Sequence, residues 1–232
     1  MELLENFNKN IKKIEEEIKN SAKPLKKNSS PIKLIAVTKN QPILAWTALL
    51  KSNIRDIGEN KVQEAIKKIN LFPQRKQFKI HFIGKLQKNK VKKAVEIFDV
   101  IQTVDTIQLA EKINNTSKEK NKQQEIHIQI NISKDPKKGG MFEEDVINTV
   151  KKIILMNNFV LTGVMTILKE GLTKEKILLN YIKIKKIQEK IQSTICPTCI
   201  NSSMGMSKDY KDAIAAGATH IRLGTNLFGK RL

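Results

Sequence analysis

The chain has 232 residues, with 43 Lys and Arg against 23 Asp and Glu, which gives a formal net charge of +20 at pH 7. This length can bury one sizeable core, so a single domain over residues 1–232 is expected. Nucleic-acid binding is not expected, because the basic residues are spread through amphipathic segments and aromatic residues make up only 5% of the chain. The sequence has no apolar run of membrane-spanning length and no signal-peptide pattern at its start, which predicts a cytoplasmic protein without a membrane partner.

Cysteine and histidine give little sign of a redox or metal site. Cys196 and Cys199 have the spacing of a redox pair or of half a zinc site, but a zinc site needs two more ligands. The pair is therefore interpreted as incidental, in a reducing cytosol. His81, His127 and His220 each fall in a strand-like run, which favours hydrogen-bonded core histidines.

The predicted elements begin with a helix over 1–20 and a loop over 21–31. Lys33 to Lys39 is typical of a short buried strand that ends in a lysine, because Asn40, Gln41 and Pro42 follow at once. Further strands are predicted at 54–57, 78–83, 100–104, 126–132, 160–167, around 195–200 and at 220–223. Helices are predicted between them, at 43–50, 62–69, 91–98, around 109–113, at 144–155, 174–191 and around 210–216.

This alternation indicates the fold. Parallel strands need crossover helices, and eight of them can close, so a (β/α)8 TIM barrel is predicted. An open doubly wound sheet is the alternative, weakened because no G-x-G-x-x-G pattern follows the first strand. The few residues after the last strand cannot form a full outer helix, and the extra N-terminal helix is expected to fill that gap.

A barrel places its site at the carboxyl ends of the strands. The residues expected there are Lys39, Gly58 to Asn60, Gly84, Asp105, Asn131, Met165 and Thr166, Ser202 to Ser207, and Arg222 to Thr225. They include no carboxylate pair and no histidine cluster. This set favours a site that holds an anion and a carbonyl group over a hydrolytic one.

Two turns suggest the anion. Ser202 to Ser207 leads into a helix and Gly224-Thr225 follows the last strand, so both could present amide and hydroxyl groups to a phosphate. Ordinary helix N-caps are the alternative for each turn. Arg222 adds a positive charge at the same rim. The combination indicates phosphate, because barrel phosphate sites often lie after strands seven and eight.

Lys39 would then be the partner of the carbonyl group. An amine at an apolar barrel mouth loses hydration, which favours its neutral, nucleophilic form and Schiff-base formation. A solvated lysine at the strand end is the alternative. A phosphate pocket facing an amine suits a phosphorylated aldehyde, and pyridoxal 5′-phosphate (PLP) is the obvious candidate.

Five blocks of this sequence resemble the pyridoxal phosphate homeostasis proteins. They are Ala36 to Lys39, Gly58 to Glu64, His81 to Lys90, Ser203 to Ser207, and Arg222 to Thr225. The resemblance implies a barrel similar to the N-terminal domain of alanine racemase, with PLP held as a Schiff base on Lys39. It also implies that Ser203, Ser207, Gly224 and Thr225 hold the phosphate, that Arg222 faces the pyridine nitrogen and that Asn60 lines the pocket.

The function implied by the resemblance is PLP homeostasis. Such a protein would buffer or deliver the cofactor, with effects on amino-acid and keto-acid balance, without established catalytic turnover and with no catalytic residues assigned. Apo PLP enzymes would be the candidate recipients, and a monomer is expected.

Two alternative functions stay open. A PLP-dependent amino-acid racemase would need a second acid or base, and Tyr181 and Tyr210 both fall on predicted helices. A cofactor-free Schiff-base aldolase would use Asp105 or Glu59 to move protons.

Overall fold

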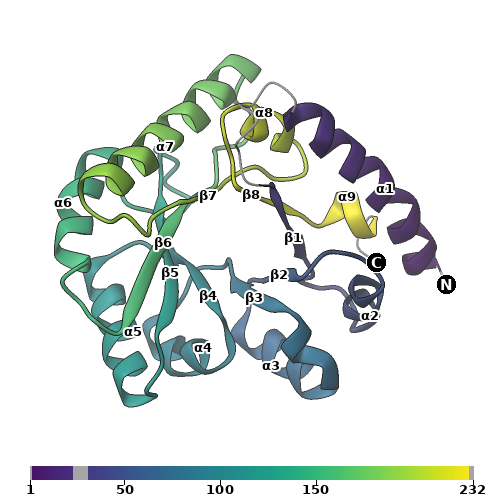
Figure 1. Ribbon diagram of the computed structural model, residues 1–232, viewed down its shortest axis with the longest axis horizontal. Coiled ribbons are helices and arrows are strands. Elements are labelled where there is room, and N and C mark those ends of the chain that lie inside the picture. The colour runs from purple at the N-terminus through teal and green to yellow at the C-terminus, as the bar shows by residue number, and fades with distance from the viewer. Residues whose placement is uncertain (1, 23–30, 230–232) are drawn as a thin grey trace.

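In the computed structural model, which describes residues 2–22 and 31–229, eight parallel strands close into a barrel in the order β1 to β8 (Figure 1). The strands are β1 (Lys33–Val37), β2 (Asp56–Glu59), β3 (Lys79–Phe82), β4 (Val100–Val104), β5 (Gln124–Ile130), β6 (Phe159–Thr166), β7 (Asn201–Ser203) and β8 (His220–Leu223). Closure comes from β1 pairing with β8, with Lys33 opposite His220. The predicted barrel is confirmed, and this pairing excludes an open sheet.

The helices form the outer layer of the barrel (Figure 1). The α-helices are α1 (Glu2–Ala22), α2 (Leu44–Leu50), α3 (Val62–Leu71), α4 (Val91–Ile97), α5 (Ile107–Glu119), α6 (Glu143–Ile153), α7 (Lys174–Thr194), α8 (Tyr210–Ala215) and α9 (Thr225–Phe228). Short 3₁₀ turns lie at Pro73–Gln77 and Lys88–Lys90. Each crossover helix buries an apolar stripe against the sheet, as the helical spacing of its apolar residues requires.

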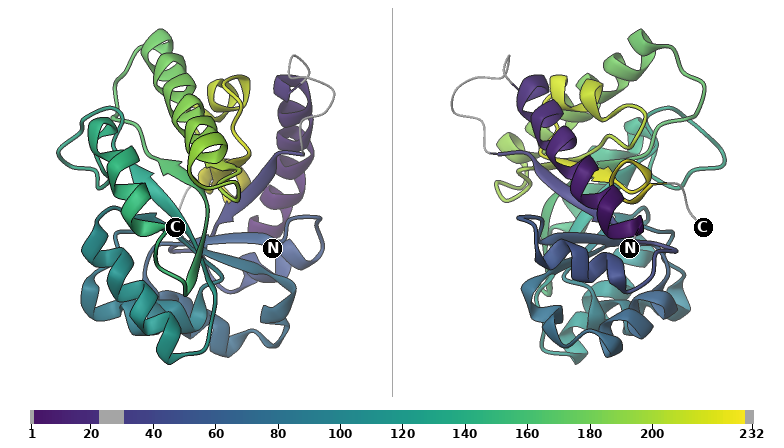
Figure 2. Two further views of the ribbon diagram at one scale, coloured as in Figure 1. Left: turned by 60° about the vertical axis from the view of Figure 1, so that its left-hand side comes forward. Right: turned by 90° about the vertical axis from the view of Figure 1, so that its right-hand side faces the viewer.

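Helix α1 takes the place that a full eighth outer helix would occupy. It lies beside α8 and α9 in both views of Figure 2. The Phe7 ring stacks on the Phe228 ring with centroids 5.6 Å apart, and Asn10 Nδ2 donates to the Leu227 carbonyl oxygen at 3.2 Å. The prediction that the N-terminal helix fills the gap left by the short α9 is confirmed.

Strand β7 lies later in the chain than its predicted position. It covers Asn201–Ser203, whereas 195–200 forms the turn after α7. The prediction was wrong because Ile195 and Ile200 carry the apolar signal, while the strand itself is polar and short. Strand β2 likewise lies two residues later than predicted, at Asp56–Glu59. Most of the predicted loop over 21–31 lies outside the described residues.

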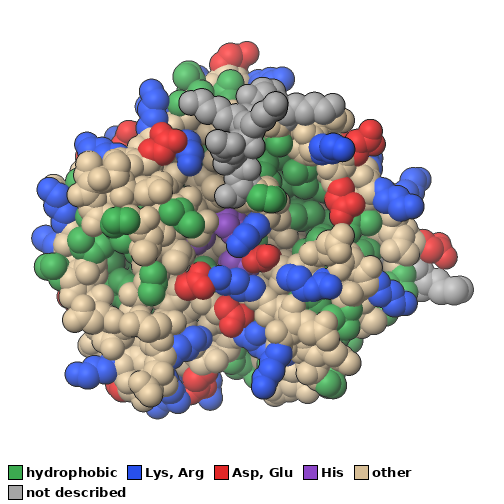
Figure 3. Space-filling model, in the orientation of Figure 1, with side chains coloured by type: hydrophobic (Ala, Val, Ile, Leu, Met, Phe, Trp, Pro, Cys, Tyr) green, Lys and Arg blue, Asp and Glu red, His purple; other side chains and the backbone are tan. Residues whose placement is uncertain are grey.

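All three histidines are buried inside the barrel. His81 bonds to Asp56 Oδ1 through Nε2 and to Gln102 Nε2 through Nδ1, both at 2.8 Å, which makes it a hydrogen-bonded core histidine as predicted. Burial lowers the pKa of His220 to about 3 and lowers the pKa of His127 well below its ordinary value. Figure 3 shows histidine side chains at the centre of one face, with Lys, Arg, Asp and Glu around them.

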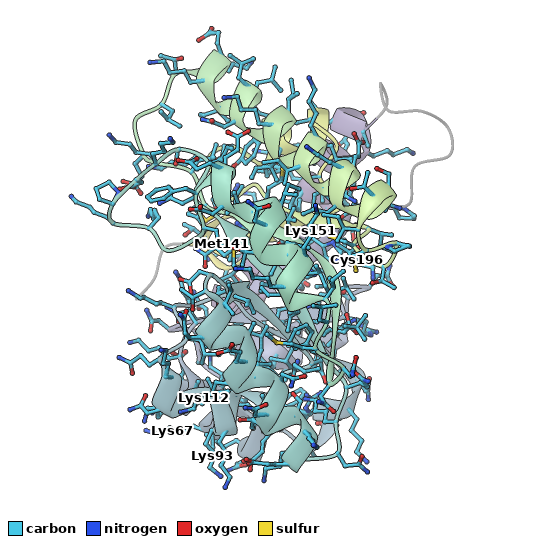
Figure 4. The ribbon with its side chains drawn as sticks, turned by 90° about the vertical axis from the view of Figure 1, so that its left-hand side faces the viewer. Lys67, Lys93, Lys112, Met141, Lys151 and Cys196 are labelled. Carbon is cyan, nitrogen blue, oxygen red and sulfur yellow. The ribbon has the colours of Figure 1, made fainter. Side chains whose placement is uncertain are left out.

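The positive charge is dispersed over the outer helices. Figure 4 labels four exposed lysines that come from four different helices, Lys67 on α3, Lys93 on α4, Lys112 on α5 and Lys151 on α6. This distribution differs from the single basic face that is typical of nucleic-acid modules. Among residues 2–22 and 31–229, no helix combines the length and apolar character needed to cross a membrane.

Candidate functional site

A cavity of about 660 Å³ lies at the carboxyl ends of the strands, where the barrel fold predicts a site. Six of the seven predicted site residues line it: Lys39, Asn60, Ser207, Arg222, Gly224 and Thr225. Ser203, the seventh, does not line it. Segments that are up to 186 positions apart, from Lys39 to Thr225, therefore meet in one cavity because the sheet is closed.

Lys39 lies two residues after β1, in a turn that its neighbours hold firmly. Thr38 is fully buried, and its hydroxyl donates to Glu59 Oε1 at 2.6 Å and accepts from Trp46 Nε1 at 3.0 Å. Asn40 has a φ of 57°, a left-handed conformation that asparagine tolerates better than most residues. Its amide donates to Glu64 Oε1 at 2.6 Å. Lys39 itself is half-buried.

An ion cluster, buried except for the partly exposed Glu64, contacts this turn. Lys68 Nζ donates to Glu59 Oε1 and Glu64 Oε1, each at 2.8 Å, and to the Thr38 carbonyl oxygen at 2.6 Å. Burial raises the pKa of the Glu59 carboxyl, although the Lys68 ammonium acts in the opposite direction. We call this group the Lys68 cluster; it consists of Lys68, Glu59, Glu64 and Thr38.

Arg222 enters the cavity from β8 and is 3% exposed. Its Nη1 donates to Ser203 Oγ and its Nη2 to the Thr166 carbonyl oxygen, both at 2.7 Å. Within the described part of the chain it forms no ion pair with a carboxylate. Burial lowers the pKa of Arg222, but a guanidinium stays protonated at neutral pH. The cavity therefore contains a fixed positive charge. Asp209 lines the same cavity and raises the pKa of Arg222 by its charge, without an ion pair between the two among the described residues.

The turns after β7 and β8 meet beside Arg222. The Arg222 amide donates to the Gly205 carbonyl oxygen at 3.0 Å, and Asn226 Nδ2 donates to the Ser207 carbonyl oxygen at 3.2 Å. Gly205 has a φ of +90°, and a Cβ there would lie 2.6 Å from Ala213 Cβ, so only glycine fits. The two hydrogen bonds between the turns hold Ser207 next to Gly224 and Thr225 in the cavity wall.

Asn60 lies at the end of β2, on the wall of the same cavity. Its Oδ1 is buried and has no hydrogen-bond partner within the part of the chain that the structure describes. Gly84 packs closely on the backbone of Asn60: a Cβ added at Gly84 would lie 2.2 Å from the backbone carbonyl oxygen of Asn60. A buried polar atom without a partner is costly, which points to a ligand group at this position.

The rim of the cavity is cationic. It is lined by five lysines besides Lys39 and by only two acidic residues: Lys85, Lys137, Lys138, Lys169 and Lys208, against Glu170 and Asp209. Such an excess attracts an anion such as a phosphate monoester. The two tyrosines and Asp105 do not line the cavity. Tyr210 instead donates to Glu17 of α1, and Tyr181 is buried in α7.

Sequence reasoning missed the residues that support the site from below. Lys68 continues the apolar stripe of α3 formed by Val62 and Ala65, and a lysine on a buried stripe is the signal that could have identified it. Gln102 lies in the middle of β4, and its Oε1 accepts from Ser203 Oγ at 2.8 Å. No feature of the sequence around it indicates this contact.

Comparisons with known proteins agree with this architecture. Residues 4–231 match the family model described as alanine racemase, N-terminal domain. The pyridoxal phosphate homeostasis protein of Synechocystis sp. is 39% identical over 201 residues, which cover 87% of this chain and 92% of that protein.

Solved structures give the same result. PipY of Synechococcus elongatus PCC7942, solved with PLP bound, superposes with a TM-score of 0.80 at 33% identity, covering 91% of this chain and 100% of that one. An alanine racemase of Clostridium difficile 630 superposes with a TM-score of 0.76 over 97% of this chain and 60% of its own, and at 18% identity it shows the fold alone. The chain belongs to the alanine racemase N-terminal domain family and, within it, to the pyridoxal phosphate homeostasis proteins.

Proposed function

We propose that this protein binds PLP as a Schiff base on Lys39 and acts in PLP homeostasis, buffering or delivering the cofactor. The observation that carries the proposal is the meeting of Lys39, Arg222 and the Ser207 turn in one cationic cavity. An amine, a fixed cation and a phosphate-binding turn are the groups that a phosphorylated pyridine aldehyde requires. The relatives named for PLP homeostasis, and PipY with PLP bound, support the proposal.

The residues present fit this cofactor. The phosphate would contact Ser207 with the backbone of Gly224 and Thr225, and the lysine-rich rim would favour its charge. Ser203 does not line the cavity, and its hydroxyl is shared between Arg222 and Gln102. Its contact with the phosphate therefore remains a prediction. Asn60 Oδ1, buried without a partner among the described residues, would face a polar group of the cofactor.

Arg222 would face the pyridine nitrogen. A guanidinium only donates hydrogen bonds, so that nitrogen would act as an acceptor and stay unprotonated. The bound cofactor would supply an aldehyde for imine exchange and a ring that withdraws electrons. With an unprotonated nitrogen, the ring withdraws electrons weakly, which suits holding the cofactor better than turnover.

Absence of catalytic turnover is therefore part of the proposal. A racemase needs a second acid or base opposite the lysine, and neither Tyr181 nor Tyr210 lines the cavity. The aldolase alternative is disfavoured in the same way, because Glu59 is buried in the Lys68 cluster and Asp105 lies outside the cavity wall.

We also propose a single-domain, monomeric, cytoplasmic protein that hands the cofactor to apo PLP enzymes. Light scattering of the purified protein tests the monomer. Incubating the PLP-loaded protein with an apo-enzyme and following the recovery of that enzyme's activity tests delivery.

The spectrum of the PLP-loaded protein tests the main proposal. After removal of excess PLP, the wild type should keep a visible absorbance band that borohydride abolishes, and Lys39→Ala should lack it. Lys67→Ala on the outer face of α3 is the matched control. A protein that cannot be loaded would overturn the proposal, and racemisation of alanine at ordinary enzyme rates would favour the racemase.

A further inference from the structure

The Lys68 cluster contacts the chain on both sides of Lys39. Lys68 bonds to the Thr38 carbonyl oxygen, directly before Lys39, at 2.6 Å. It also bonds to Glu64 Oε1 at 2.8 Å, and this oxygen accepts from the Asn40 amide, directly after Lys39, at 2.6 Å. One ammonium group on α3 thus links both peptide groups that flank the proposed attachment point.

The cluster is built to be rigid. The Lys68 side chain is 8% exposed, and its three protons have three acceptors at hydrogen-bond distance. The Glu59 side chain is fully buried and also accepts from the Thr38 hydroxyl at 2.6 Å. A buried cation in such a network holds its partners in one geometry, because any displacement leaves a buried charge without a partner.

The turn needs this support. Asn40 adopts a left-handed φ of 57°, which an unsupported turn residue other than glycine adopts at a cost. The Asn40 amide has the Glu64 carboxylate as its acceptor, and Glu64 is itself held by Lys68. The backbone on both sides of Lys39 is therefore bonded to the Lys68 and Glu64 side chains of α3.

We propose that Lys68 and Glu64 are positioning residues that aim the Lys39 amine at the aldehyde carbon of the bound cofactor. This inference rests on the proposed function, because it needs Lys39 as the attachment point. Neither residue lines the cavity, so both act through the turn. Loss of the cluster should impair the covalent step and leave binding of the phosphate group nearly unchanged, since the phosphate turns lie after β7 and β8.

Two ligands separate positioning from general stability. PLP binds through its phosphate and its aldehyde, whereas 4-deoxypyridoxine 5′-phosphate has the same ring and phosphate and no aldehyde. The dissociation constant of each would be measured for the wild type, Lys68→Met, Glu64→Ala and Glu64→Gln. Lys67→Met is the matched control, because Lys67 is the exposed neighbour of Lys68 on α3 (Figure 4). The pH dependence of the visible band would be recorded for each variant.

Lys68→Met and Glu64→Ala should weaken PLP binding by about tenfold or more, a loss of the size expected when a reacting group is misplaced. Both should shift the pH profile of the band and change affinity for the aldehyde-free analogue by less than about twofold. Glu64→Gln keeps an oxygen acceptor for the Asn40 amide and should restore most of the PLP affinity. Glu64 is partly exposed, so Glu64→Ala keeps the test decisive if Lys68→Met does not fold.

Equal losses for PLP and the analogue, or wild-type PLP binding by both folded variants, would overturn the inference. Its failure can be told from failure of the proposed function. A wild type that forms the band, with Lys39→Ala lacking it, upholds the proposed function even where the Lys68 and Glu64 variants behave like the wild type. A wild type that forms no band overturns both.

Discussion

Arg222 Nη1 donates to Ser203 Oγ at 2.7 Å, and the same hydroxyl donates to Gln102 Oε1 at 2.8 Å. Gln102 in turn bonds to His81, and His81 bonds to Asp56 at the start of β2. A chain of side-chain hydrogen bonds thus crosses the barrel interior and ends at the arginine of the cavity. Ser203 belongs to this interior chain, whereas Ser207, four residues later, lines the cavity.

The two serines should therefore respond differently to removal of the hydroxyl. Ser203→Ala leaves a buried guanidinium donor and a buried amide acceptor without their partner, so the free energy of unfolding should fall by about 2 kcal/mol. Ser207→Ala should cost less than about 0.5 kcal/mol, since the side chain is only half-buried, and should weaken PLP binding more than Ser203→Ala does. Urea unfolding and PLP titration of both variants check this. Equal stability of the two variants would contradict the assignment.

Gly84 should be irreplaceable even by alanine. The added methyl would lie 2.2 Å from the Asn60 carbonyl oxygen, and backbone cannot move away as a side-chain end can. Gly84→Ala should lower the free energy of unfolding by about 3 kcal/mol and weaken PLP binding by displacing Asn60.

Gly58→Ala is the comparison for this variant. Its methyl would meet side-chain ends, Ile83 Cδ1 at 3.0 Å and Ile35 Cγ2 at 3.1 Å, which can shift. A cost of about 1 kcal/mol is expected. If Gly84→Ala proves no more damaging than Gly58→Ala by denaturant unfolding, the close approach of Gly84 to Asn60 is not a constraint.

Stability should fall in mild acid because of the buried histidines. Burial lowers the pKa of His127 and His220, so both rings stay neutral in the folded protein. The unfolded chain binds protons on both below a pH of about 6.5, and the free energy of unfolding must then decrease as the pH falls. For His220 the decrease continues toward its folded pKa of about 3.

The expected slope is about 1.4 kcal/mol per pH unit for each histidine between about pH 6 and pH 4. Burial alone would raise the pKa of Asp56, but the bond to His81 and nearby positive charges lower it overall. Protonation of this carboxylate therefore also lowers the free energy of unfolding, at more acidic pH. Urea unfolding at about pH 7, 6 and 5 measures the slope, and His127→Gln should reduce it by about half. A free energy of unfolding that stays constant over this interval would refute the assignment of neutral rings.

Apolar periodicity predicted most of the fold because every strand except β7 contains apolar side chains. It misplaced β7, whose Asn201, Ser202 and Ser203 carry no apolar signal and are held by pairing with β6 and β8. The predicted site residues lie at or after the carboxyl ends of strands, and closure of the barrel brings six of them to one cavity. Lys68 left a signal, a lysine on the buried stripe of α3, but its partners depend on contacts between residues distant in sequence. Gln102 left no such signal, and its bond to Ser203 also joins residues distant in sequence.

Lys39 is the residue to which we propose that PLP is attached. The most direct measurement is borohydride reduction of the PLP-loaded protein, followed by peptide mass spectrometry to locate the phosphopyridoxyl group. The structure predicts that the phosphopyridoxyl group lies on Lys39, in a single peptide. No labelled peptide is expected from Lys39→Ala. Label distributed over rim lysines such as Lys85 and Lys208, with Lys39 unmodified, would contradict the account.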